Sequence, residues 1–231
     1  MGPLLDGMRL VGFDLDGTLI DSAPDLAAAL NRLLESRGRS PLPLERVRAL
    51  IGDGMEQLVS RALDESAAPG ALEGAAAVAP LAPAQAEFRD LYRGRLFNHS
   101  RIYPGAREAL AQLARGGWRC CCITNKESSL AEALLQAAGL DRWLEFCLGP
   151  QLPQERKPAP DLLHKGAVRA GVSVRELLYV GDSRNDLLAA RAAGCRIGLV
   201  TYGYRQGIEL AELHPDALID DLRELLAQRA Q

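Results

Sequence analysis

"VGFDLDGTLIDS", residues 11–22, ends an apolar run on two aspartates, Asp14 and Asp16, and follows them at once with Gly17 and a threonine. The apolar run is typical of a buried strand. A carboxylate at the end of such a strand is costly to desolvate unless a cation meets it. The pair therefore belongs either to a solvated turn or to one half of a charged site, and the rest of the chain has to distinguish the two.

Short strand patterns recur from residue 118 onward and alternate with helical patterns. They read "WRCCCITN", "LEFCLG", "LLYVGD", "RIGLVT" and "DALI". Between the first two, Leu130, Leu134 and Ala138 form a one-sided helical stripe that ends at Gly139. Strands and helices that alternate at this spacing predict βαβ units. The chain is therefore expected to have an α/β fold, with a doubly wound, Rossmann-like parallel sheet covered on both faces by helices.

The segment between the first strand and the next clear strand pattern is helical. In "SAPDLAAALNRLLESRG", Ser22 is expected to be the N-cap, with Asp25 three residues later completing the signal. Further amphipathic segments follow, and the Ala/Pro/Gly-rich stretch "SAAPGALEGAAAVAPLAP" connects two of them. We expect a core of residues 1–20 and 99–231, and an inserted all-helical cap at 21–98.

The composition of the chain excludes several classes of partner and site. The 231 residues carry a net charge of −3, with no basic block, which argues against nucleic acid as a partner. No run of about 18 apolar residues occurs, which argues against a membrane span. Three of the five cysteines are consecutive in a strand pattern, a poor geometry for disulfides, and the three histidines are scattered. These features favour a cytoplasmic protein with reduced cysteines and no zinc site.

Four strand-end regions deliver polar side chains to one edge of the predicted sheet, where ligands bind in open parallel sheets. These residues are Asp14 and Asp16, Thr124 and Asn125, Lys157, and Asp182 with Asp186. Four acidic groups in one cleft need a cation, and hard oxygen ligands select Mg²⁺ over zinc. A magnesium ion and a lysine together would seat a phosphoryl group, with Thr124 and backbone amides on its remaining oxygens.

"DLDGT", "ITN", "RKPAPD" and "GDSRND", in that order, resemble the four motifs of the haloacid dehalogenase superfamily, and the helical insert resembles its C1-type cap. The resemblance extends from Leu10 to about Leu226. Within the superfamily, "GLVTYGYRQGIEL" and "HPDALIDDLREL" resemble the phosphoglycolate phosphatase subfamily. The resemblance implies a Mg²⁺-dependent phosphatase that hydrolyses a small phosphorylated metabolite, 2-phosphoglycolate first, through an aspartyl-phosphate.

The resemblance also implies a role for each site residue. Asp14 would be the nucleophile and a metal ligand. Asp16 would protonate the leaving alcohol and then activate water, with its backbone carbonyl on the metal. Thr124 and Lys157 would bind the phosphoryl group, and Asn125 would assist them. Asp182 would bind the metal, and Asp186 would support it. Gly17 would then let the backbone approach the phosphate closely.

The cap must supply the rest of the substrate site. Gly52 and Gly54 in "IGDGMEQL" would bring backbone amides onto the substrate, although a plain turn between helices fits the same residues. Cap arginines such as Arg32 or Arg61 are candidates for the carboxylate of the substrate. A sugar-acid phosphatase acting on N-acetylmuramate 6-phosphate and a mutase of the β-phosphoglucomutase kind remain alternatives.

Other classes fit less well. A dehalogenase has no use for Asp16, and a phosphonate-cleaving relative needs a cap lysine, of which residues 21–98 contain none. A phosphoacceptor signalling module lacks both the late "GDSRND" and a long helical insert, and a catalytically silent binding protein stays open. Tyr202 and Tyr204 are expected to pack in the core or in a subunit contact rather than to act in catalysis.

Overall fold

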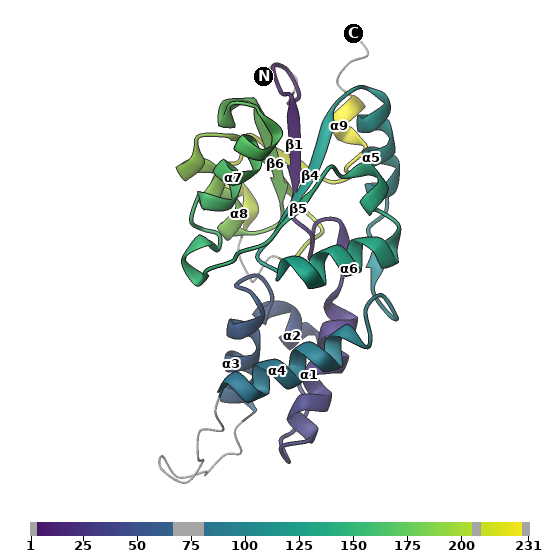
Figure 1. The fold of residues 1–231 in the computed structure, drawn as a ribbon, viewed down its shortest axis with the longest axis vertical. Coiled ribbons are helices and arrows are strands. Elements are labelled where there is room, and N and C mark those ends of the chain that lie inside the picture. The colour runs from purple at the N-terminus through teal and green to yellow at the C-terminus, as the bar shows by residue number, and fades with distance from the viewer. Residues whose placement is uncertain (1–3, 67–80, 205–208, 228–231) are drawn as a thin grey trace.

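The computed structural model describes residues 4–66, 81–204 and 209–227, so most of the Ala/Pro/Gly-rich connection lies outside the described residues. These residues form an α/β part and a helical part, and the helical part lies beyond the ends of the strands of the sheet (Figure 1). Among the described residues, no helix is both long and apolar enough to cross a membrane.

The α/β part contains a six-stranded sheet in the order β5-β4-β1-β6-β7-β8, and all of its strand pairs are parallel. This arrangement confirms the predicted fold class. The strands are β1 (Leu10–Phe13), β4 (Arg119–Ile123), β5 (Cys147–Leu148), β6 (Leu177–Gly181), β7 (Arg196–Val200) and β8 (Ala217–Ile219). Short 3₁₀ turns occur at Asp141–Trp143, Pro153–Glu155, Val174–Glu176 and Leu210–Leu213.

Helices cover both faces of this sheet. One face packs against α5 (Ala106–Arg115), α6 (Ser128–Ala138) and α9 (Glu224–Ala227), and the other packs against α7 (Asp161–Ala170) and α8 (Arg184–Ala193). The strand period of two explains the split, because Cys120 and Cys122 lie in the first core and Cys121 lies in the second. All five cysteines are among the described residues, and all are buried and free.

The central strand β1 sets where the site forms. Phe13 lies opposite Cys122 of β4 and Val180 of β6, so the three strands end together. The backbone N–H of Asp14 still donates to the carbonyl of Val180, at 2.8 Å. The residues that follow these strands therefore meet at one edge of the sheet, as the order of the motifs predicted.

The helical part has a core of its own. It consists of α1 (Ala23–Glu35), α2 (Leu44–Leu50), α3 (Met55–Glu65) and α4 (Leu81–Arg93). Leu130 and Tyr204 from the α/β part complete its apolar cluster. The chain crosses between the two parts through a short antiparallel pair, β2 (Ile20–Asp21) with β3 (Arg101–Ile102). The expectation that the whole segment between β1 and β4 is helical is wrong at this crossing.

The predicted N-cap position of α1 is confirmed, but the expected capping contacts of Ser22 and Asp25 do not form. Ser22 occupies the N-cap position but makes no capping hydrogen bond, and its hydroxyl donates to the Asp16 carboxylate instead. The fully buried carboxylate of Asp25 accepts the backbone N–H groups of His99 and Ser100, each at 2.9 Å, and the Ser100 hydroxyl at 2.6 Å. Both side chains serve the crossing between the two parts, and this tertiary role outweighs local capping.

We predict that Asp25→Asn destabilises the protein by about 1–3 kcal/mol, because an amide keeps only one acceptor oxygen and turns its own N–H groups toward donors. Urea denaturation measures the free energy of unfolding. Asp90→Asn, which changes an exposed aspartate on α4, is the matched control and should cost less than about 0.5 kcal/mol. Equal stability of the two variants would show that the hydrogen bonds of Asp25 do not stabilise the protein.

Candidate active site

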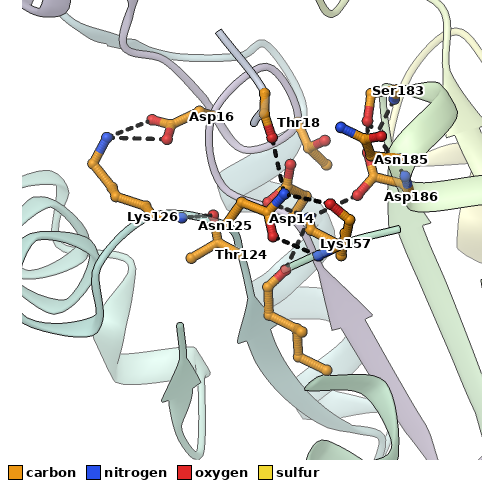
Figure 2. Close-up of polar contacts among 12 residues, drawn as sticks. Asp14, Asp16, Thr18, Thr124, Asn125, Lys126, Lys157, Ser183, Asn185 and Asp186 are labelled. Carbon is orange, nitrogen blue, oxygen red and sulfur yellow. Dashed lines mark hydrogen bonds and ion pairs between the residues drawn. The ribbon is translucent and has the colours of Figure 1, made fainter. Parts of the chain in front are cut away.

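A cavity of about 50 Å³ lies between the sheet edge and the helical part. Asp14, Thr124 and Asp182 line it from three strand ends, and Asp16 lines it from the turn after β1. The structure therefore brings together most of the side chains that the sequence assigned to one site (Figure 2).

Lys157 lies next to Asp14 and makes ion pairs with two carboxylates. Its Nζ is 2.9 Å from Oδ1 of Asp14 and 2.7 Å from Oδ1 of Asp186. It also donates to the hydroxyl of Tyr179, at 2.8 Å. Burial alone would lower the pKa of Lys157, but the attraction of Asp14 and Asp186 outweighs it and raises the pKa. Lys157 therefore stays charged at neutral pH.

Asp186 connects Lys157 to the start of α8. Its Oδ2 accepts the N–H groups of Asp182, at 3.2 Å, and Ser183, at 3.0 Å, and the Ser183 hydroxyl at 2.6 Å. Lys157 holds the pKa of Asp186 below its usual value, although complete burial acts to raise it. Both Asp186 oxygens are thus engaged by protein groups. This arrangement suits the supporting role expected for Asp186.

Asp182 makes no ion pair with the described residues, and Asp14 shares its cationic partner, Lys157, with Asp186. The backbone N–H of Tyr204 donates to Oδ2 of Asp182 at 2.6 Å, and Thr18 lies 3.4 Å from Oδ1. Burial, followed by repulsion from Asp186 and Asp14, raises the pKa of Asp182 well above its usual value. Burial raises the pKa of Asp14 to about 6, although Lys157 opposes the shift.

These carboxylates fit a divalent cation. Oxygens of Asp14, Asp182 and Asp186 all lie within 4.8 Å of one another. Oδ1 of Asp14 is buried and makes an ion pair but no hydrogen bond with the described residues. An all-oxygen set with excess negative charge suits Mg²⁺. Because Asp186 is fully engaged, the carboxylates left for a metal are those of Asp14 and Asp182.

Asp16 points away from this cluster. Both of its carboxylate oxygens lie 3.0 Å from Nζ of Lys126, and Figure 2 shows the pair on the side of the site away from Asp186. The sequence interpretation missed Lys126, which follows "ITN" directly. The composition contained one signal for it. Only three of the 27 basic residues are lysines, so each lysine is a candidate for a specific role.

Asn125 and Gly17 hold the site in shape. The Asn125 amide accepts the N–H of Lys157 at 2.8 Å and donates to the carbonyl of Gly52 at 2.9 Å, so it connects the sheet edge to the helical part. Its contact with phosphate stays a prediction. Gly17 has a φ of +88°, and a Cβ there would lie 2.1 Å from Oδ2 of Asp182. Only glycine fits this position.

The helical part contributes differently from what was expected. Gly52 and Gly54 do line the cavity, but Gly52 meets the α/β part through its carbonyl. Neither cap arginine lines it. Arg32 is exposed, and Arg61 pairs with Asp53 at 2.6 Å.

Tyr204 combines two roles, and only one of them was expected. It packs in the apolar cluster of the helical part, as predicted. It also lines the cavity, and its backbone N–H holds Asp182. The structure therefore places it in the site as well as in the core.

Comparison with known proteins gives a consistent result. A family model described as haloacid dehalogenase-like hydrolase matches residues 8–194. Phosphoglycolate phosphatase 1 of Pseudomonas aeruginosa is 42% identical over 221 residues, covering 94% of this chain and 78% of that protein. Phosphoglycolate phosphatase of Nitrosospira multiformis is 40% identical over 218 residues, covering 94% and 93%. A crystal structure of a predicted phosphoglycolate phosphatase from Haemophilus somnus superposes with a TM-score of 0.86 at 34% identity, covering 96% of this chain and 97% of that one.

The raised pKa values of Asp14 and Asp182 predict how metal binding depends on pH. Protons and Mg²⁺ compete for the same oxygens, so affinity falls as the pH drops through about 6, the pKa of Asp14. The same Mg²⁺ concentration, about 100 times the Kd at pH 7.5, is used at both pH values. It should raise Tm by about 5–10 °C at pH 7.5 and by clearly less at pH 5. Thermal denaturation measures both gains. Asp182→Asn should lose most of the gain at pH 7.5, and an equal gain at the two pH values would contradict the site.

Proposed function

The chain is a phosphatase of the haloacid dehalogenase-like hydrolase family, and we propose that it hydrolyses 2-phosphoglycolate to glycolate and phosphate. The observation that carries the chemistry is the contact of Asp14 with Lys157, at 2.9 Å, together with the position of Asp14 and Asp182 at the cavity wall. The names of the relatives support the choice of substrate. The small cavity favours a short substrate over the sugar-acid alternative, N-acetylmuramate 6-phosphate.

In the first step, a carboxylate oxygen of Asp14 attacks phosphorus and displaces the alkoxide of glycolate, which leaves an aspartyl-phosphate. Lys157 and Thr124 hold the phosphoryl oxygens, and Asp16 protonates the departing oxygen. When bound by Asp14, Asp182 and the carbonyl of Asp16, Mg²⁺ supplies positive charge to the phosphoryl oxygens.

In the second step, Asp16 takes a proton from a water molecule that attacks the same phosphorus atom. The phosphorus–oxygen bond to Asp14 breaks, and the free carboxylate and phosphate are restored. The proton that Asp16 gave up in the first step is thereby recovered, so the cycle balances. Asp186 keeps Lys157 in place through both steps without touching the substrate.

Residues 21–98 act as the cap in this proposal. Gly52 and Gly54 close one wall of the cavity and so exclude water from the aspartyl-phosphate. The buried, free cysteines support a cytoplasmic location.

A screen of phosphorylated metabolites, ranked by kcat/KM, tests the substrate. We expect kcat/KM for 2-phosphoglycolate to exceed that for glucose 1-phosphate by roughly 10- to 100-fold or more, because only the former offers a carboxylate to a small cavity. Free orthophosphate should be released in equal amount with glycolate. No preference between the two substrates, or phosphate reappearing on another sugar hydroxyl, would reject the substrate assignment and leave the family intact.

The two aspartates should respond differently to the leaving group. Asp14→Asn should lower kcat by about 10³-fold or more for every substrate, because the nucleophile is lost. Asp16→Asn should cost about 10²- to 10⁴-fold with 2-phosphoglycolate and much less with 4-nitrophenyl phosphate, whose leaving group needs no proton. Steady-state kinetics on both substrates measures this contrast. An equal loss on the two substrates in Asp16→Asn would make Asp16 a structural residue only.

A further inference from the structure

The wall of the cavity on the side of the helical part differs in polarity from the sheet edge. Most of it is apolar, formed by helical-part side chains such as Met55, Leu58 and Phe88. Of the described residues that line the cavity, Lys126 carries the only cationic side chain. Lys126 is 8% exposed, and attraction to Asp16 outweighs burial and raises its pKa, so it brings a full positive charge into an apolar surrounding.

Tyr92 of α4 lies beside this charge. Nζ of Lys126 is 4.6 Å from the centre of the Tyr92 ring. The Tyr92 hydroxyl is buried and makes no well-aligned hydrogen bond with the described residues, and the only polar group among them that interacts with it closely is the Lys126 ammonium, which cannot accept its proton. A buried hydroxyl without an acceptor costs about 1–3 kcal/mol, so its presence at a cavity wall points to a ligand that accepts its proton.

The donor capacity of the pair leaves room for a second carboxylate. An ammonium group has three donor hydrogens, and the Asp16 oxygens provide two contacts, each at 3.0 Å. The Tyr92 hydroxyl adds a further donor. Lys126 already holds one carboxylate symmetrically in this structure, which shows that its surroundings accept that shape and charge.

The backbone of Lys126 lies next to the phosphoryl subsite. Lys126 lies two residues after Thr124, and its backbone N–H donates to Oγ1 of Thr124 at 3.2 Å. Two residue steps span at most about 7 Å, so the backbone anchors of the two subsites are close. This spacing suits a substrate with few atoms between its phosphate and its second anionic group.

We propose that Lys126 and Tyr92 bind the carboxylate of the substrate, and that these two side chains select a short, carboxylate-bearing phosphomonoester. The assignment rests on the proposed function and replaces the cap arginines as the selecting groups. Specificity thus comes from one residue of the α/β part and one of the helical part, and the ligand bridges the two.

The test compares 2-phosphoglycolate with its carboxamide analogue, which has the same size and lacks the charge. The measured quantity is the ratio of kcat/KM for the acid to kcat/KM for the amide. Lys126→Met should lower this ratio by about 10- to 100-fold, mainly through KM of the acid, since charged hydrogen bonds are the stronger ones. Tyr92→Phe keeps the ring and should lower the ratio by about 2- to 10-fold.

Lys165→Met is the matched control. Lys165 lies on α7, is half exposed and pairs with Glu155 at 2.6 Å, and its loss should leave the ratio unchanged. If Lys126→Met slows both substrates equally, Lys126 only positions Asp16 and the inference is overturned. The same holds if Tyr92→Phe, which keeps the ring, retains the full ratio. A ratio near one in the unmodified enzyme also overturns the inference, whereas failure of the proposed function would appear as no preference for 2-phosphoglycolate over glucose 1-phosphate, so the two failures are distinguishable.

Discussion

The ion pairs of Lys157 are the interaction on which the site depends. One ammonium group, 3% exposed, faces Asp14 and Asp186, and Asp182 lies close by. Burial, with repulsion among the three carboxylates around this one lysine as a further cause, raises the pKa values of Asp14 and Asp182. The fold tolerates this because Asp186 is fully hydrogen-bonded at the start of α8. The remaining imbalance is what a divalent cation would remove.

The same fold separates two aspartates that are only two residues apart. Asp14 lies deep at the end of β1 against Lys157, whereas Asp16 lies at the cavity wall against Lys126 and the Ser22 hydroxyl. The turn that Gly17 permits makes this divergence possible. Two chemically identical side chains thereby acquire different surroundings, which nucleophilic attack and proton transfer require of a carboxylate pair.

Sequence reasoning succeeded where one physical rule applied. Parallel strands end at one edge, so Asp14, Thr124 and Asp182 had to meet once their strands were recognised, and the alternation of Cys120, Cys121 and Cys122 followed from the period of two. Sequence reasoning failed where residues far apart in the sequence determine the contacts of a side chain. The strands β2 and β3 have two residues each, too few to show a period. Ser22 and Asp25 carry a capping pattern, but Asp16 and Ser100 recruit them instead. Lys126 acquires its meaning only from Asp16 and Tyr92.

The contacts between the helical part and the α/β part differ in strength, and this difference bears on substrate binding. At the crossing, Asp25 holds buried N–H groups firmly. At the cavity, the links are hydrogen bonds, from Asn125 to the carbonyl of Gly52 at 2.9 Å and from Asn185 to Asp53 at 2.6 Å, and ion pairs with at least one well-exposed partner, Arg156 with Glu56 and Arg89 with Glu127. Such pairs contribute about 0–1 kcal/mol each. The exposed ion pairs therefore add little to the hydrogen bonds and to the apolar contacts of Leu130 and Tyr204 that join the two parts. A ligand that bridges Lys126 and Tyr92, as proposed, would add a further link between the two parts and would favour their present arrangement for a substrate with the right second charge.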